Sequence, residues 1–182
     1  MKLIVAGATG FVGKEVIRQA LRNPAVTCVV ALARKAVLAP DNAGLNADIS
    51  KLQSVILEDW TSPYPEIVRT HIENADACIW YVTPSHVNVT SSRIFCRTLA
   101  VTPSRSREMD FSDVTRICYD YTIDGLRNMA AIANKPFRFV YTSGVMVERD
   151  QSKSLPAMGD YFLMRARCFL SSSRHFDGNL TT

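Results

Sequence analysis

The chain has 182 residues, of which 47% are hydrophobic and 21% charged, an ordinary composition for one globular domain with a sizeable core. Its net charge of +4 comes from lysines and arginines that are scattered along the sequence rather than clustered. Such a mild and scattered excess does not favour nucleic acid as a partner. No apolar stretch is long enough to cross a membrane, and no N-terminal signal peptide is visible.

The amino-terminal part of the sequence alternates apolar, strand-like runs with helix-like patterns. Residues 2–6 form the first predicted strand, and apolar residues at helical spacing predict a helix over residues 11–22. Asn23 and Pro24 end that helix. The next predicted elements are strands over residues 26–32, 53–57 and 75–82, separated by a loop over residues 36–50 and a short helix over residues 65–73.

The carboxyl-terminal part continues this alternation. The longest helix is predicted over residues 114–134 and a fifth strand over residues 137–142. Strands that alternate with helices pair in parallel through right-handed crossovers. We therefore predict an α/β fold with a doubly wound parallel sheet of about five strands and a truncated C-terminal part. One domain is expected over residues 1–165, followed by an irregular tail over residues 166–182.

A short repeat interrupts this plan between the fourth strand and the longest helix. The sequence Val-Thr-Pro-Ser at residues 82–85 recurs at residues 101–104. Because long loops without structure of their own are uncommon in compact domains, we predict an insertion over residues 83–100. Removing residues 82–98 would join the two copies of the repeat. The alternative is a chance duplication of four common residues, and transcript sequencing across this segment separates the two.

A glycine-rich loop joins the first predicted strand to the first predicted helix. Its pattern is Gly-x-x-Gly-x-x-Gly, in which the first glycine permits a tight turn and the second lets the backbone approach phosphates. The third lets the helix pack close to the strand, and the free N–H groups of the helix then hold a pyrophosphate. The loop predicts a dinucleotide site, with a glycine-rich turn of another α/β protein as the alternative. The residues expected to bind the cofactor here are Gly7, Thr9, Gly10, Phe11, Val12 and Gly13.

A basic pair follows the second predicted strand. No acidic residue lies between Glu15 and Asp41, whereas a chain that prefers NAD places an acid here to bind the ribose 2′-hydroxyl. Arg34 and Lys35 can instead meet a 2′-phosphate, Arg34 with its planar fork. We therefore favour NADP over NAD as the cofactor. An ordinary solvated basic turn is the alternative.

Asp59 follows the third predicted strand. A carboxylate at this position can accept a hydrogen bond from the adenine amino group, so Asp59 is a further candidate for cofactor binding. A turn or helix-capping role for the same side chain remains an alternative.

The cysteines and histidines of the chain make no metal-binding pattern. The five cysteines lack Cys-x-x-Cys spacing, and His71, His86 and His175 lie far apart. We therefore expect no metal site. The cysteines are interpreted as reduced thiols, which are typical of a cytoplasmic protein.

A serine, a tyrosine and an arginine near the carboxyl terminus form a further pattern. Ser143 follows the fifth predicted strand, Tyr161 comes eighteen residues later, and Arg165 lies four residues after Tyr161. Together with the glycine loop and the basic pair, they make residues 1–165 resemble an atypical short-chain dehydrogenase/reductase. That family has an NAD(P)-binding Rossmann domain, and the resemblance is to its NmrA-like or NAD-dependent epimerase-like group.

The resemblance implies catalytic roles for these three residues. In that family a serine polarises the substrate carbonyl and a tyrosine exchanges the proton during hydride transfer. By their positions, Ser143 and Tyr161 take these roles. Arg165 stands where the family has a lysine that lowers the pKa of the tyrosine and holds the nicotinamide ribose. Its permanent charge can favour a tyrosinate, but its bulk and fork geometry differ from those of lysine. The alternative is that Ser143 is a turn residue and that Tyr161 packs as an aromatic side chain.

The resulting hypothesis is an oxidoreductase that transfers a hydride between NADP(H) and a carbonyl or alcohol. Its partners would be the dinucleotide and a small-molecule substrate that the sequence does not identify. A non-catalytic protein that binds the dinucleotide and reports it to a protein partner is one alternative. A truncated, inactive isoform is another.

Overall fold

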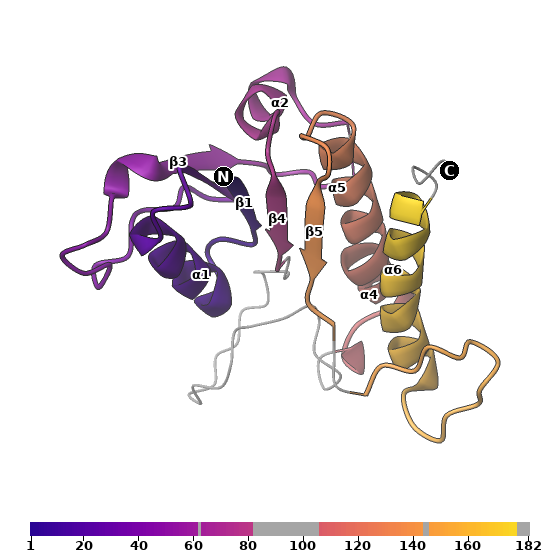
Figure 1. Ribbon diagram of the computed structural model, residues 1–182. Helices are drawn as coiled ribbons and strands as arrows, with labels where there is room; N and C mark the ends of the chain where they lie inside the picture. Colours follow the sequence, from indigo (N-terminus) through magenta and orange to yellow (C-terminus); the bar gives the residue numbers. More distant parts are fainter. Residues whose placement is uncertain (62, 82–105, 144–145, 178–182) are drawn as a thin grey trace.

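The computed structural model describes the chain except for residues 62, 82–105, 144–145 and 178–182. Across the described residues, one parallel five-stranded sheet has the strand order β3-β2-β1-β4-β5 (Figure 1). The strand order reverses between β1 and β4, as it does in a Rossmann sheet. The predicted doubly wound parallel fold is confirmed. The strands are β1 (Lys2–Ala6), β2 (Cys28–Ala33), β3 (Leu52–Ile56), β4 (Ala77–Trp80) and β5 (Arg138–Tyr141).

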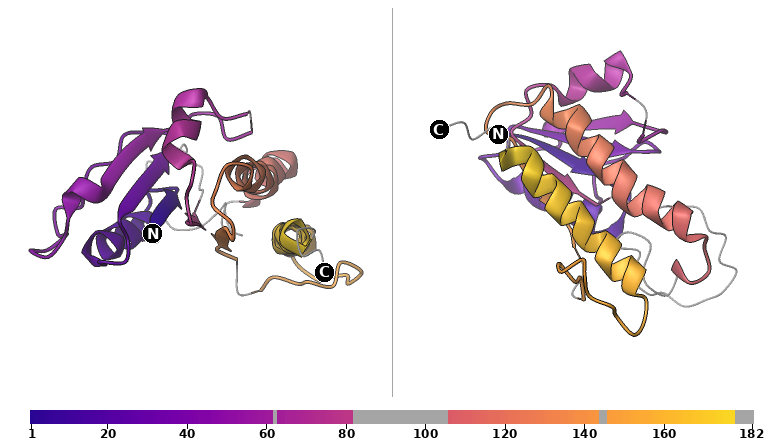
Figure 2. Two further views of the ribbon diagram at one scale, coloured as in Figure 1. Left: turned by 45° about the horizontal axis from the view of Figure 1, so that its top comes forward. Right: turned by 90° about the vertical axis from the view of Figure 1, so that its right-hand side faces the viewer.

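Helices lie on both faces of the sheet (Figure 2). One face is covered by α1, and the other by α2 and α5, as the membership of two apolar clusters shows. A last long helix, α6, packs beside α5. The helices are α1 (Phe11–Arg22), α2 (Glu66–Ile72), α4 (Phe111–Thr115), α5 (Tyr121–Ala130) and α6 (Gly159–Asp177), with a short 3₁₀ helix, η1 (Ile49–Lys51).

The central strand β1 is buried on both faces. Leu3 and Val5 pack in the cluster that contains α1, whereas Ile4 and Ala6 pack in the cluster shared with α2 and α5. None of the four side chains is more than 5% exposed. Successive side chains of a strand point to opposite faces, so a strand covered on both sides reads as a continuous apolar run. This is the run from which the first strand was predicted.

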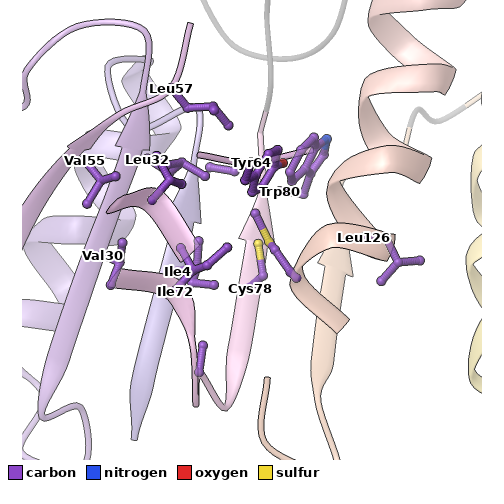
Figure 3. Close-up of a cluster of buried hydrophobic side chains, with 14 of the residues drawn as sticks. Ile4, Val30, Leu32, Val55, Leu57, Tyr64, Ile72, Cys78, Trp80 and Leu126 are labelled. Atoms are coloured by element: carbon purple, nitrogen blue, oxygen red, sulfur yellow. The ribbon is translucent and has the colours of Figure 1, made fainter. Parts of the chain in front are cut away.

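Trp80, the last residue of β4, is the largest fully buried side chain of the core (Figure 3). Its ring meets Trp60 edge-on, with centroids 5.3 Å apart, and lies 5.6 Å from the ring of Phe139. Helix α5 approaches the same ring through Gly125, where a Cβ would overlap the indole. The absence of a side chain at Gly125 therefore lets α5 pack directly on the carboxyl end of β4.

The predicted helix over residues 114–134 occurs as a continuous run of three segments. It starts earlier, at Phe111, because the Asp110 carboxylate caps it by accepting a hydrogen bond from Ser112 N at 2.7 Å. A π-helical turn, η2 (Arg116–Asp120), separates α4 from α5. The α5 segment ends at Ala130, before residue 134.

The expectation of an irregular tail over residues 166–182 is wrong for residues 166–177, which belong to α6. Tertiary packing explains the error. Met164, Ala166 and Cys168 are each at most 3% exposed, so this part of α6 has a buried side. That side could not be recognised from the sequence, because the polar residues around it obscure the helical pattern. The predicted insertion over residues 83–100 lies outside the described residues.

Candidate functional site

The loop after β1 makes a turn that requires glycine. Gly7 has a φ of +79°, in the left-handed region that glycine adopts without strain. Its N–H donates to the Leu32 carbonyl oxygen at 3.0 Å, which ties the loop to β2. The N–H of Gly10 then donates to the Gly7 carbonyl oxygen at 3.0 Å. The chain is thus turned sharply at the carboxyl end of β1 before α1 begins.

Gly13 lies where α1 passes closest to this loop. A Cβ at this position would lie 2.6 Å from the Gly7 carbonyl oxygen and 2.9 Å from the Cα of Ala8. Both neighbours are backbone atoms, which cannot rotate away as a side chain can. Only glycine therefore allows α1 to start this close to the strand end.

The N-terminus of α1 offers unpaired backbone donors. Its first intrahelical hydrogen bond runs from Lys14 N to the Gly10 carbonyl oxygen at 2.9 Å. The N–H groups of residues 11–13 precede this bond and have no partner within the helix. The first turn carries no acidic side chain, and the positive end of the helix dipole lies here. These features suit a phosphate or pyrophosphate.

The remaining predicted loop residues leave this helix end accessible. Thr9 is exposed, Val12 is half-buried, and the Phe11 ring is 72% exposed. A large apolar side chain held in water beside a helix N-terminus is available to contact a ligand. The loop residues proposed for cofactor binding therefore lie together around one open helix end.

The basic pair lies at the same edge of the sheet. Ala6 pairs with Leu32 in the register of β1 and β2, so Arg34 follows β2 next to the glycine loop. Arg34 is half-buried, and Lys35 is exposed. Both cations therefore lie at the same edge of the sheet as the glycine loop.

Asp59 follows β3 at this edge and shapes a local turn. Its Oδ1 accepts hydrogen bonds from Thr61 N at 2.9 Å and from Thr61 Oγ1 at 2.7 Å. The side chain is exposed. The turn role that the sequence left open is therefore present, and it occupies one of the two carboxylate oxygens. Adenine recognition by Asp59 stays a prediction.

Arg165 reaches the backbone beside Ser143. Ser143 is exposed and lies just beyond β5, whereas Arg165 is only 3% exposed on α6. The Arg165 Nη2 donates to the carbonyl oxygen of Thr142 at 2.8 Å. The fold therefore brings the predicted arginine to the residue that precedes the predicted serine.

Tyr161 lies in an apolar cluster between α6 and the α4–η2 segment. It is 8% exposed and packs with Val114 and Ile117, and its ring meets Phe162 edge-on at 5.4 Å. Burial raises the pKa of Tyr161, and the charge of Arg165 opposes this effect without outweighing it. The Tyr161 hydroxyl is therefore protonated at neutral pH. Burial therefore acts against the tyrosinate that a cation at position 165 could favour.

A buried chain of hydrogen bonds links β4 to α6. Trp80 Nε1 donates to Thr122 Oγ1 at 3.1 Å, and that hydroxyl donates to the Cys118 carbonyl oxygen at 3.0 Å. The same carbonyl accepts a hydrogen bond from Cys168 Sγ at 3.0 Å. Cys118 belongs to the π-helical turn η2. The chain therefore runs from the carboxyl end of β4 through η2 and α5 to the helix that bears Tyr161.

Tyr141 is a residue of this region that sequence reasoning missed. The Arg165 guanidinium carbon lies 5.1 Å from the centroid of its ring. The sequence places Tyr141 at the end of a predicted strand, two residues before Ser143, which could have marked it as a neighbour of the site. The sequence does not predict its contact with Arg165, because the two residues lie 24 positions apart and meet only through the packing of α6.

No helix among the described residues is long and apolar enough to span a membrane. Within the same part of the chain, no three His, Cys, Asp or Glu side chains lie together in a way that could hold a metal ion.

The sequence matches no family model and no curated protein. The structure does resemble solved proteins. DesIV, a dTDP-glucose 4,6-dehydratase from Streptomyces venezuelae with NAD bound, has a TM-score of 0.58 at 20% identity, over 98% of this chain and 52% of that one. UDP-glucuronic acid 4-epimerase from Bacillus cereus in complex with NAD has a TM-score of 0.54 at 17% identity, over 98% and 53%.

A short chain dehydrogenase family protein from Francisella tularensis is similar as well, with a TM-score of 0.55 at 14% identity, over 91% of this chain and 58% of that one. This chain spans little more than half the length of each of these proteins. At such identities the likeness shows the fold. The chain has the Rossmann fold of these solved proteins, and the fold that the sequence resemblance implied is confirmed.

Proposed function

We propose that this protein binds a nicotinamide dinucleotide, with the pyrophosphate at the N-terminus of α1. The geometry of the glycine loop is the observation that carries the proposal. Gly7 turns the chain at φ +79°. Gly13 lets α1 start close to the strand end, because a Cβ at this position would lie only 2.6 Å from the Gly7 carbonyl oxygen. The unpaired N–H groups and the dipole then attract the phosphates. The NAD-bound dehydratase and epimerase of the same fold support this assignment.

The cofactor that we propose is NADP(H), because Arg34 and Lys35 lie beside the loop and can pair with a 2′-phosphate. The similar solved proteins were found with NAD, so this preference rests on the two side chains alone. Asp59 is proposed to accept a hydrogen bond from the adenine amino group. None of the four described cysteines is part of a disulfide bond, which supports a reducing compartment such as the cytoplasm.

The reaction that we propose is hydride transfer between NADP(H) and a carbonyl or alcohol. The nicotinamide supplies or accepts the hydride when it is bound. Ser143, exposed beyond β5, would donate a hydrogen bond to the substrate oxygen, and the protonated Tyr161 hydroxyl would supply the proton. Arg165 would hold the Thr142 carbonyl, and with it the backbone that leads into Ser143.

A non-catalytic dinucleotide-binding protein is the second candidate. The burial of Tyr161, which is 8% exposed with a raised pKa, favours it, because a proton donor must reach its substrate. In that case the bound dinucleotide would be sensed by a protein partner.

Fluorescence titration with NADPH and NADH tests the binding proposal. The wild type is expected to bind NADPH more tightly than NADH, and Gly13→Ala is expected to abolish binding because its Cβ meets backbone atoms of the phosphate loop. Gly159→Ala is the matched control, since it adds a methyl group outside the glycine loop, where the nearest atom is the Leu155 Cβ at 3.2 Å. Absence of binding of either dinucleotide to the folded wild type would disprove the proposal.

Oxidation of NADPH in the presence of a panel of aldehydes and ketones tests the chemistry. Tyr161→Phe removes only the proposed proton donor and should lower the turnover rate by about 10²–10⁴-fold while leaving NADPH binding intact. Tyr119→Phe, a change to another partly buried tyrosine, is the control. Tight NADPH binding with no turnover of any substrate would select the non-catalytic candidate.

A further inference from the structure

The guanidinium of Arg165 is buried with one end unsatisfied. The residue is 3% exposed, and its Nη2 donates to the Thr142 carbonyl oxygen at 2.8 Å. Its Nη1 is also out of contact with solvent, yet it has no hydrogen-bond partner. Buried guanidinium N–H groups without an acceptor are strongly unfavourable, so such an atom calls for an explanation.

The charge of Arg165 is not balanced by a carboxylate. Among the described residues, the ion pairs found between basic and acidic side chains do not include Arg165. The ionisable groups that act most strongly on it are two phenols and two thiols, of Tyr141, Cys118, Tyr161 and Cys168. Burial raises the pKa of Tyr141, Tyr161 and Cys168. These three groups are therefore neutral near pH 7 and leave the cation uncompensated.

A second buried polar atom lies beside this cation. The Arg165 guanidinium carbon is 5.1 Å from the centroid of the Tyr141 ring, and the Tyr141 hydroxyl oxygen is buried without a hydrogen-bond partner. The Cys168 sulfur is the neighbour of this hydroxyl, and a weak hydrogen bond between the two groups acts on the pKa of both. Sulfur is a poor acceptor, and the Cys168 S–H itself donates to the Cys118 carbonyl oxygen. The hydroxyl keeps its proton, so it is available as a second donor.

We propose that Arg165 Nη1 and the Tyr141 hydroxyl together bind a carboxylate at the carboxyl end of β5. A carboxylate offers two oxygens to a guanidinium and carries the negative charge that this buried cation lacks. A water molecule would satisfy one donor but leave the charge uncompensated. A single carboxylate would accept hydrogen bonds from both Arg165 Nη1 and the Tyr141 hydroxyl, and it would neutralise the charge of the guanidinium.

The carboxylate has two conceivable sources. It can be a free small ion, or it can be a substituent of a substrate whose carbonyl is held by Ser143, one residue beyond Thr142. The second source rests on the proposed function and would make a carboxylated carbonyl compound the substrate class. Carboxylate binding itself does not depend on a dinucleotide.

Thermal unfolding of the whole chain without dinucleotide tests the binding. The melting temperature is measured against sodium acetate at constant ionic strength, because a ligand of the native state raises it with concentration. We expect a clear rise for the wild type and none for Arg165→Met. Tyr141→Phe should bind acetate about tenfold more weakly, since it loses one hydrogen bond to a charged group.

Two control variants separate this site from general salt effects. Arg167→Met removes an exposed arginine of the same helix, which lies 5.2 Å from the Tyr119 ring. Tyr64→Phe removes another buried hydroxyl without a partner, at a position that is not among those acting on Arg165. Both should keep the wild-type response. Tyr141→Phe remains decisive if Arg165→Met does not fold.

The two sources are distinguished by comparing acetate with pyruvate, in the absence and presence of NADPH. Equal effects of the two acids support a free ion, and a pyruvate effect that strengthens with NADPH supports a substrate carboxylate. A wild type that does not respond to either acid, or variants at Arg165 and Tyr141 that respond like the wild type, would overturn the carboxylate site whether or not NADPH binds.

Discussion

The two halves of the proposed site are built by different means. Around α1, the glycine loop presents backbone N–H groups at an open helix end, and its shape depends on the absence of side chains at Gly7 and Gly13. At the junction of β5 and α6, the contacts are made by buried side chains, above all those of Arg165, Tyr141 and Cys168. A site made from backbone tolerates most substitutions around it, whereas a site made from buried side chains depends on each one.

The difference extends to solvent access. Phe11 at the glycine loop is 72% exposed, but Tyr161 at the junction is 8% exposed. A ligand can therefore meet the loop in the form that the structure shows. The proton transfer proposed for Tyr161 would require the residues around it to move apart. The protein could therefore bind a dinucleotide at the loop without catalysing a reaction at the junction.

The largest expected effect concerns the buried chain of hydrogen bonds that links β4 to α6. Thr122→Val should lower the free energy of unfolding by about 1–3 kcal/mol, because Trp80 Nε1 would be buried without a partner. Thr70→Val is a close control, since Thr70 Oγ1 also donates to the carbonyl four residues earlier but at an exposed position of α2, and should change stability by less than about 0.5 kcal/mol. Urea unfolding measures both. If the two variants lost equal amounts of stability, the buried hydrogen bond of Thr122 would contribute no more to stability than the exposed hydrogen bond of Thr70.

The next effect concerns the basic pair at the glycine-loop end. Arg34→Gln should weaken NADPH binding about tenfold through the loss of a charged hydrogen bond to the 2′-phosphate, with little change for NADH. Arg22→Gln, at the exposed far end of α1, should leave both affinities unchanged. Titration with the two dinucleotides checks the result, and an equal loss for both would contradict 2′-phosphate recognition.

A smaller effect is expected from the thiol that docks α6. Cys168→Ala should cost about 1 kcal/mol of stability, because the Cys118 carbonyl loses the S–H donor. Cys168→Ser keeps a donor at this position and should cost less. Chemical unfolding of the three proteins gives the comparison. A serine variant less stable than the alanine variant would show that apolar packing, and not the hydrogen bond, holds the helix.

The smallest effect lies on the exposed side of α1. Hydrogen bonds from Arg18 and Gln19 lower the pKa of Glu15 from 4.5 to about 2. A lowered native pKa means that the stabilising contribution is present above pH 4.5 and is lost as the pH falls toward 2. Glu15→Gln should therefore be slightly less stable than the wild type at neutral pH and equal to it near pH 2. A difference that persists at the acidic end would point to a cause other than this carboxylate.

The glycine-loop half could largely be predicted from the sequence, because its features are local. The spacing of Gly7 and Gly13 and the apolar run before them specify a strand, a turn and a helix within fifteen residues. The β5–α6 junction could not be predicted in the same way. Its defining contacts join Arg165 to Thr142 and Cys168 to Cys118, residues 23 and 50 positions apart.

Two local errors have the same physical origin. The polar sequence after Arg165 suggested an irregular tail, but burial of Ala166 and Cys168 against neighbouring helices keeps it helical. The charge of Arg165 suggested a lowered pKa for Tyr161, but the desolvation that comes with packing is larger. Both depend on tertiary surroundings that neither propensity nor spacing contains.

The π-helical turn η2 sets the rotational phase between α4 and α5. Deleting one residue within Arg116–Asp120 would convert this wide turn into ordinary α-helix and would rotate everything before it by about 100° relative to α5. Val114 would then leave its place against Tyr161, while α5 kept its contact with Trp80 through Gly125. The extra residue of this turn thus allows one continuous helical run to serve two differently oriented neighbours, the sheet on one side and α6 on the other.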